Sequence, residues 1–131
     1  AARLGDQHAN FGLVAGGGGS QRLPRLIGAR RAKELMLLGG WLGAADALAW
    51  GLVNRVVPAG TVAAAVEEMA TALAAGSASA NRTAKALVSR AFDTDLAEGL
   101  ELERRLVAQH MRSADAAEGL RSFAEKRKPV F

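Results

Sequence analysis

Asp6 and His8 are residues near the beginning of the chain whose types and spacing could support proton transfer. An imidazole has an unperturbed pKa of about 6.5, so His8 is a competent general acid or base near neutral pH. If this segment is extended, Asp6 projects to the same face as His8, because side chains two residues apart on a strand share a face. Asp6 could then orient the imidazole. The alternatives are a carboxylate that faces solvent and a histidine that only lines a pocket.

A run of glycines at residues 16–19, followed by Ser20, comes soon after this pair. A flexible linker would be flanked by polar sequence without structure, yet apolar residues precede the run and a periodic helical pattern follows it. A P-loop needs a Gly-Lys pair, which the chain lacks, and a dinucleotide fingerprint would need glycine where Gln21 or Arg22 stands. The sequence therefore predicts a tight turn before a helix. Its N–H groups could hold an anion, a carbonyl or a water, or the turn could bind nothing.

The elements that follow this turn are predicted to be short. Proline is tolerated in the first turn of a helix but not in its interior, so Pro24 limits where the first helix begins. We expect Ser20 to be its N-cap and Gly28 to bend or interrupt it. A second helical piece covers about residues 44–50. The β-branched residues of LVNRVV predict a strand at 52–57.

The rest of the chain is predicted to be helical. Apolar residues recur at helical spacing in three successive stripes, which is the pattern of amphipathic helices. The stripes comprise Val62, Val66, Met69 and Leu73; Leu87, Val88, Ala91 and Phe92; and Leu96, Leu100, Leu106 and Val107. His110 follows the third stripe and is predicted to be structural. A last helix is predicted to begin at Ser113 as N-cap and to end before Pro129. Because few elements can cover the third stripe, we expect the chain to self-associate.

Composition limits the class of protein. With 131 residues, 50% of them hydrophobic and 23% charged, the chain is at most one globular domain. It contains no cysteine, which excludes a disulfide framework and a thiolate metal site, and we predict no metal and a cytoplasmic location. The beginning shows neither a secretory signal nor an initiator methionine, so we expect a truncated start.

Two segments bear on membrane and nucleic-acid partners. Residues 36–53 are nearly long enough to cross a bilayer, but Asp46 and several glycines within them indicate short buried elements instead. Lys126, Arg127 and Lys128 form a basic tail, which is usually solvated and could otherwise meet an anionic ligand. Aromatic residues make up only 5% of the chain, too few for a base-stacking surface. We therefore expect neither a membrane span nor a nucleic-acid partner.

Four distinctive stretches follow one another along the chain: GLVAGGGGSQRLPRLIG, AKELMLLGG, AADALAWGLVNRVVP and EGLRSFAEKRKPVF. In this order they resemble the signatures of the crotonase family, the enoyl-CoA hydratases and isomerases. The resemblance covers essentially the whole chain and implies that it corresponds to the C-terminal half of the family's fold. The implied fold class is α/β, the C-terminal part of a β-β-α spiral that is mostly helical in this chain. Core turns would occupy residues 1–92 and a helical trimerisation region residues 93–131.

The same resemblance implies roles for individual residues. His8 stands where the family's hydratases carry a catalytic glutamate. The N–H of Gly16 is implied to hold the reacting water, and Gly17 and Gly18 are implied to contact the substrate. The ordinary hydratase reaction is in doubt without the glutamate, so His8 becomes the candidate proton-transfer group.

The implied activity is that of an acyl-CoA enzyme of fatty acid metabolism, a lyase or isomerase. It would stabilise a thioester enolate while a 2-enoyl-CoA is hydrated or its double bond moves. Coenzyme A would be the substrate carrier, with Phe123 against the adenine and Lys126 near a phosphate, and no cofactor would stay bound. Trimers or hexamers are implied. Two alternatives remain open: a non-catalytic acyl-CoA binder, and a structural trimerisation fragment that lacks the half with the oxyanion hole.

Overall fold

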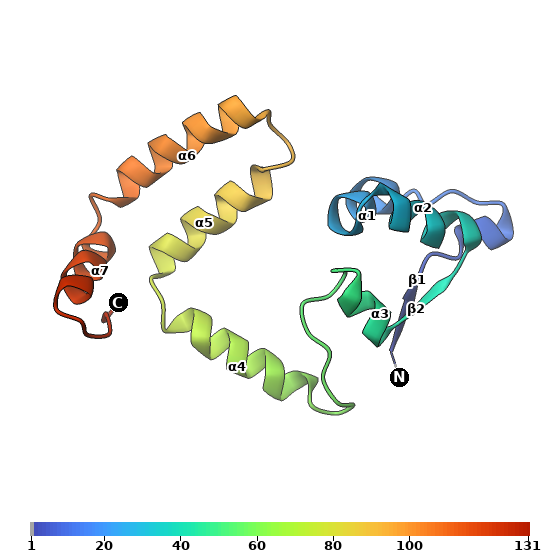
Figure 1. Cartoon of the computed structure of the whole chain (residues 1–131), viewed down its shortest axis with the longest axis horizontal. Coiled ribbons are helices and arrows are strands. Elements are labelled where there is room, and N and C mark those ends of the chain that lie inside the picture. The colour runs from blue at the N-terminus through green and yellow to red at the C-terminus, as the bar shows by residue number, and fades with distance from the viewer. Residues whose placement is uncertain (1) are drawn as a thin grey trace. The chain divides into compact units, whose positions relative to one another are not determined.

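The computed structural model describes residues 2–131, which divide into two compact units. The first unit extends to Val62 and the second begins at Ala63. Figure 1 shows the helices and strands of each unit.

The first unit combines a small sheet with short helices. Strand β1 (Arg3–Gly5) pairs antiparallel with β2 (Trp41–Gly43), and Leu4 lies opposite Leu42. The helical segments are the 3-10 helix η1 (His8–Phe11) and the α-helices α1 (Gly19–Ile27), α2 (Ala29–Leu38) and α3 (Ala44–Ala49). Helices α1 and α2 pack against each other, and α3 packs on the two strands. The buried side chains are Ala15, Ile27, Ala32, Leu35, Leu42 and Ala47.

Glycines with positive φ end the two longer helices of this unit. Gly28 has φ 81° and separates α1 from α2, so the predicted interruption is confirmed. Gly39 has φ 59° and ends α2. Glycine reaches this left-handed region at little cost because it has no Cβ. These two positions therefore fix where the helices stop and where β2 begins.

Apart from Val62, the first residue of α4, the second unit contains four helices in succession: α4 (Val62–Ala74), α5 (Ala78–Arg90), α6 (Leu96–His110) and α7 (Ala114–Ala124). The last three begin at side chains that accept a backbone N–H, namely Ser77, Asp95 and Ser113. Such caps satisfy amides that have no partner within the helix. The N-cap predicted at Ser113 is confirmed, and so is the helical character of the first and third apolar stripes. Of the second stripe, Leu87 and Val88 lie in α5, whereas Ala91 and Phe92 lie in the turn that follows it.

Asp115 connects the first turn of α7 to the beginning of α5. Its Oδ2 accepts hydrogen bonds from Ser77 Oγ at 2.5 Å and from Ser79 Oγ at 2.6 Å. Because both hydroxyls stabilise the charged carboxylate, they lower the pKa of Asp115 below its ordinary value of 3.8. Ser77 therefore serves two helices, since it also caps α5.

The predicted α/β fold class is wrong. Within residues 2–131 the strands are two three-residue segments that pair with each other, and the chain is otherwise mostly helical. The strand predicted at 52–57 does not form. The N–H groups of Leu52 and Val53 both donate to Ala47 O, at 2.9 and 3.3 Å, so the backbone wraps around the end of α3 instead of extending beside a strand.

The predicted division after Phe92 falls between α5 and α6, which pack against each other in the second unit. The structure does not test the role assigned to residues 93–131, and a trimerisation region there stays a prediction.

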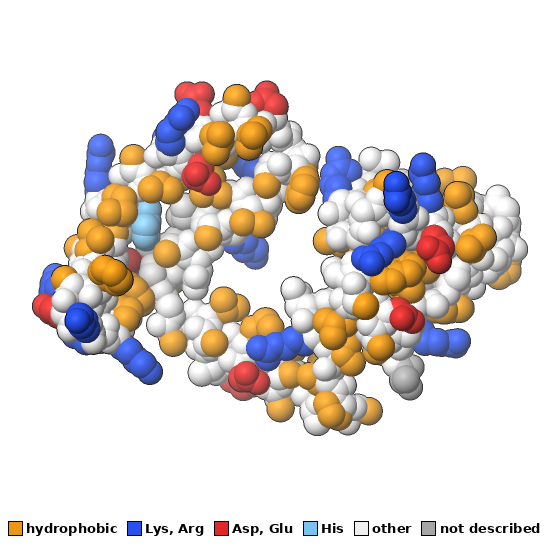
Figure 2. All heavy atoms as spheres, in the orientation of Figure 1, with side chains coloured by type: hydrophobic (Ala, Val, Ile, Leu, Met, Phe, Trp, Pro, Cys, Tyr) orange, Lys and Arg blue, Asp and Glu red, His pale blue; other side chains and the backbone are white. Residues whose placement is uncertain are grey.

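Large hydrophobic side chains remain at the surface of both units, as Figure 2 shows. On α6, Leu96 is 77% exposed and Leu100 is 44% exposed. Segment 36–53 is divided among α2, β2 and α3. Among the described residues, no helix is long and apolar enough to cross a membrane.

Candidate functional site

Asp6 and His8 meet at the turn between β1 and η1. Asp6 Oδ1 lies 2.9 Å from His8 Nδ1 and also accepts the backbone N–H of His8 at 3.1 Å. The side chains come together because the chain turns at His8, the first residue of η1, and not because the segment is extended. Asp6 is therefore a direct partner of the imidazole and not a carboxylate that faces solvent alone.

The two side chains differ in exposure. The Asp6 side chain is 14% exposed, whereas that of His8 is 47% exposed. The hydrogen bond with His8 lowers the pKa of Asp6 below its ordinary value of 3.8, because it stabilises the carboxylate. Asp6 is thus negative at neutral pH. Both residues line a shallow, open hollow together with Gly5, Gln7, Phe11 and Leu13.

Gln7 and Asn10 fix the segment that carries His8. Gln7 Nε2 donates to the carbonyl oxygens of Gly39 at 2.7 Å and of Gly40 at 3.1 Å. Asn10 Nδ2 donates to Gly39 O and to Gln7 Oε1, both at 3.0 Å. A Cβ on Gly39 would collide with the Asn10 amide, so glycine is needed there for this close approach. Sequence analysis missed this clamp, since no local pattern joins these residues to the end of α2.

The glycine run forms a turn that opens directly on α1, so the linker interpretation is wrong and the predicted turn is confirmed. The N-cap is Gly18, with φ 89°, and not Ser20 as predicted. The carbonyl of Gly18 already accepts the N–H groups of Gln21 and Arg22, at 3.2 and 2.9 Å. Ser20 consequently lies inside the first turn, where its side chain caps nothing.

Gly16 and Gly17 are under a different constraint from Gly18. Neither has a positive φ. A Cβ on Gly17 would meet nothing within 4 Å, and one on Gly16 would meet only Val14 O at 4.0 Å. Within residues 2–131 their N–H groups donate no hydrogen bond. The packing of this chain therefore does not require glycine at either position, whereas close approach of a ligand to the backbone would.

The acid–imidazole pair is adjacent to this turn. Asp6 Oδ2 lies 3.9 Å from the point where a Cβ on Gly19 would stand. In the first unit, Asp6, the predicted orienting carboxylate, thus contacts His8, the predicted proton-transfer group, and lies near Gly19 at the end of the glycine run.

Phe123 and Lys126, the predicted coenzyme A contacts, lie at the end of α7 in the second unit. Phe123 is 85% exposed. Lys126 has φ 52° and is the one non-glycine residue with positive φ among residues 2–131. Lys126 N donates to Phe123 O at 3.2 Å and Arg127 N donates to Ser122 O at 3.1 Å, which is the hydrogen-bond pattern of a Schellman motif. A lysine thus holds the position that glycine usually occupies.

Arg127 attaches the basic tail to α7. Its guanidinium meets both carboxylate oxygens of Glu118, at 2.6 and 3.1 Å, and also Glu125 Oε2 at 2.5 Å. Glu118 Oε1 further accepts the N–H of Val130 at 3.0 Å. The guanidinium, followed by this N–H, stabilises the carboxylate and lowers the pKa of Glu118 to about 2. Of the three basic residues in the tail, Arg127 is thus held in place by carboxylates.

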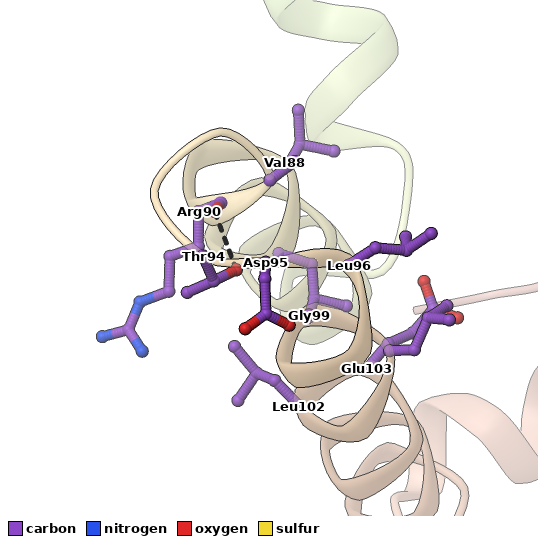
Figure 3. A pocket seen from close by; sticks show the side chains of 11 residues that line it. Val88, Arg90, Thr94, Asp95, Leu96, Gly99, Leu102 and Glu103 are labelled. Carbon is purple, nitrogen blue, oxygen red and sulfur yellow. Dashed lines mark hydrogen bonds between the residues drawn. The ribbon is translucent and has the colours of Figure 1, made fainter.

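A second hollow lies between the end of α5 and the beginning of α6, and Figure 3 shows the side chains around it. Thr94 Oγ1 donates to Arg90 O at 3.4 Å on one side, and Leu96 and Leu102 are among the apolar residues that line it. None of the predicted site residues lines this hollow. In the described part of the chain, no three His, Asp or Glu side chains are grouped so that they could hold a metal ion.

The profile of one protein family, described as enoyl-CoA hydratase/isomerase, matches residues 1–131. The chain belongs to this family. The predicted membership in the crotonase family is therefore confirmed.

Several relatives within the family illustrate the match. A probable enoyl-CoA hydratase of Mycobacterium bovis is 45% identical over 130 residues, which are 99% of this chain and 51% of that protein. The enoyl-CoA isomerase/hydratase of Mycosarcoma maydis is 37% identical over 130 residues, or 99% of this chain and 47% of that protein. The crystal structure of an enoyl-CoA hydratase from Bacillus anthracis has a TM-score of 0.92 at 38% identity and covers 100% of this chain and 51% of that chain.

The chain therefore spans about half the length of the curated relatives it matches. A mostly helical fragment of a crotonase-like fold replaces the predicted α/β spiral. The comparisons do not confirm the prediction that this half is the C-terminal one.

Proposed function

We propose that the protein to which this chain belongs acts on coenzyme A thioesters of 2-enoic acids, as a hydratase or a double-bond isomerase. The observation that carries the proposal is the Asp6–His8 pair beside the glycine turn, in a chain of the enoyl-CoA hydratase/isomerase family. Both reactions need a group that exchanges a proton with the substrate, and a half-exposed imidazole can supply it.

Different residues of this chain would have different roles in the reaction. His8 would transfer the proton, and the N–H of Gly16 would hold the water or the substrate atom that reacts. Gly17 and Gly18 would contact the acyl group. At Gly16 and Gly17 the chain leaves room and N–H donors that it does not use itself. The negative charge that develops on the thioester oxygen needs fixed N–H donors, which we assign to the part of the relatives' length that this chain does not span.

The second unit would hold part of a coenzyme A molecule, either that of its own subunit or that of a neighbouring subunit. Phe123 offers an exposed ring for the adenine, and Lys126 offers an ammonium for a phosphate. No permanently bound cofactor is needed for either reaction. We also propose a homo-oligomer, a trimer or a hexamer, because α6 exposes Leu96, Leu100 and Val107. A monomer in light scattering at micromolar concentration would contradict this assembly. A cytoplasmic location stays a prediction.

The test compares the two histidines of the chain. Hydration of crotonyl-CoA is followed by the loss of thioester absorbance, and isomerisation is followed with a 3-enoyl-CoA. His8→Ala should lower kcat by about 10²–10⁴-fold with little change in KM, because it removes proton transfer and not ground-state binding. His110→Ala, on α6, should leave turnover unchanged and serves as the control. Equal turnover by His8→Ala and the unsubstituted protein would refute the assigned role of His8.

Two outcomes would favour other functions. If the protein binds CoA esters but turns over none, a non-catalytic acyl-CoA binder is the better account, and the absence of the family's glutamate at residue 8 already favours it. If it neither binds nor reacts but self-associates, the chain is a structural assembly unit.

A further inference from the structure

The Asp6–His8 contact involves one particular nitrogen of the imidazole ring, so it bears on which nitrogen carries the proton. Nδ1 of His8 faces Asp6 Oδ1 at 2.9 Å. The same oxygen accepts the backbone N–H of His8 at 3.1 Å, so the carboxylate is held by two groups of a single residue. Gln7 and Asn10 anchor the same segment through Gly39 and Gly40. The backbone beneath His8 is therefore fixed by the clamp, and the imidazole loses its contact with a negative charge if it turns away from Asp6.

We infer that Asp6 is a positioning residue that fixes the tautomer of His8, with the proton on Nδ1 and the lone pair on Nε2. An ionised carboxylate can only accept hydrogen bonds. A neutral imidazole beside it must therefore present N–H at Nδ1, and Nε2 becomes the nitrogen that takes a proton. Free imidazole side chains in water prefer the opposite tautomer, so the assignment is specific to this contact. Its catalytic consequence rests on the proposed function, whereas the tautomer itself does not.

The consequence is that His8 starts a reaction cycle as a base. Its Nε2 lies on the side of the ring away from Asp6, and the side chain is half exposed next to the shallow hollow described above. When Nε2 takes a proton from a substrate carbon or a water, the negative charge of Asp6 stabilises the imidazolium that forms. The same arrangement orients the histidine in hydrolytic triads.

Nitrogen-15 NMR of the imidazole tests the assignment directly. The protein is labelled with 15N-histidine and measured at about pH 8.5, where an ordinary imidazole is neutral. The His8 signals are identified by their loss in His8→Gln. We expect a protonated Nδ1 and an unprotonated Nε2. Asp6→Ala should shift the population toward protonation of Nε2, whereas the control Glu34→Gln, which removes an exposed carboxylate of α2, should not.

Kinetics then separate this inference from the proposed function. Asp6→Ala should lower kcat on the order of 10–100-fold and leave KM unchanged, by analogy with the loss of a hydrogen-bond partner that orients a metal-bound histidine. A protonated Nε2 in the unsubstituted protein would overturn the inference even if His8 proves essential for turnover. A protonated Nδ1 in a protein that is inactive on enoyl-CoAs would support the inference and refute the proposed function. The spectrum of the unsubstituted protein does not depend on Asp6→Ala, so it decides the matter even if that variant misfolds.

Discussion

Gly17 and Gly18 are neighbours in the turn before α1, yet the structure predicts opposite effects when each is replaced by alanine. Gly18 has φ 89° and caps the helix. Gly17 lies outside the left-handed region, and a Cβ there would meet nothing within 4 Å. The fold thus requires glycine at position 18 but not at position 17. If Gly17 is nevertheless required for activity, its function is to let a ligand approach the backbone.

The size of each effect follows from these conformations. A residue with a Cβ in the left-handed region is less stable by about 1–2 kcal/mol. The new Cβ at Gly18 would also stand 3.2 Å from Arg22 Cζ, at the far end of a flexible side chain. Alanine reduces the freedom of the unfolded chain, which offsets about 0.4–1 kcal/mol. Gly18→Ala should therefore destabilise the protein by about 1 kcal/mol, whereas Gly17→Ala should be neutral or stabilising by about 0.4–1 kcal/mol.

Urea denaturation measures the stability, and hydration of crotonyl-CoA measures the activity. We expect Gly17→Ala to keep its denaturation midpoint and to lose turnover, because the methyl group occupies the space assigned to the acyl group. Gly18→Ala should lose stability. A Gly17→Ala variant with full activity would refute the reasoning about ligand approach. A Gly18→Ala variant as stable as the unsubstituted protein would refute the conformational reasoning.

Three further predictions concern the second unit. The pKa of Glu118 is about 2 when folded and 4.5 ordinarily, so the stability that the tail attachment contributes is present above pH 4.5 and is lost as the pH falls toward 2. The protection of the Val130 amide, which is its intrinsic exchange rate divided by its observed rate, should fall over that range, and Glu118→Gln should abolish the pH dependence of this protection. The lowered pKa of Asp115 has the same sign, so Asp115→Asn should lower the urea midpoint near neutral pH, and an unchanged midpoint would contradict a role in joining α5 to α7. Lys126→Gly relieves the positive φ and should stabilise the protein by up to about 1 kcal/mol while it raises KM for acyl-CoA; parallel losses of stability and binding would contradict this separation.

Much of the helical structure could be predicted from the sequence, because its determinants are local. The helical spacing of apolar residues located the helices of the second unit. Ser113 indicated where α7 begins, because serine is a common N-cap, and Gly28 indicated the break between α1 and α2. The failures have a common cause. The residues at 52–57 have strand-forming character, but a strand needs a partner, and the structure offers them only the end of α3. The short strands β1 and β2 could not be predicted, since each of them exists only because the other lies beside it.

In the candidate site, too, the features set by local sequence could be predicted, and the contacts between distant residues could not. His8 and the glycine turn could be found in the sequence because a residue type and a spacing identify them. That Asp6 contacts the imidazole could not be decided, since two opposite geometries were compatible with the spacing, and the turn at η1 selects one of them. The anchor of that turn is the side-chain clamp of Gln7 and Asn10 on Gly39, and no pattern near residue 8 indicates it. Because the clamp holds the backbone of this short segment and the carboxylate holds the imidazole itself, a histidine can be held in position here without a buried core around it.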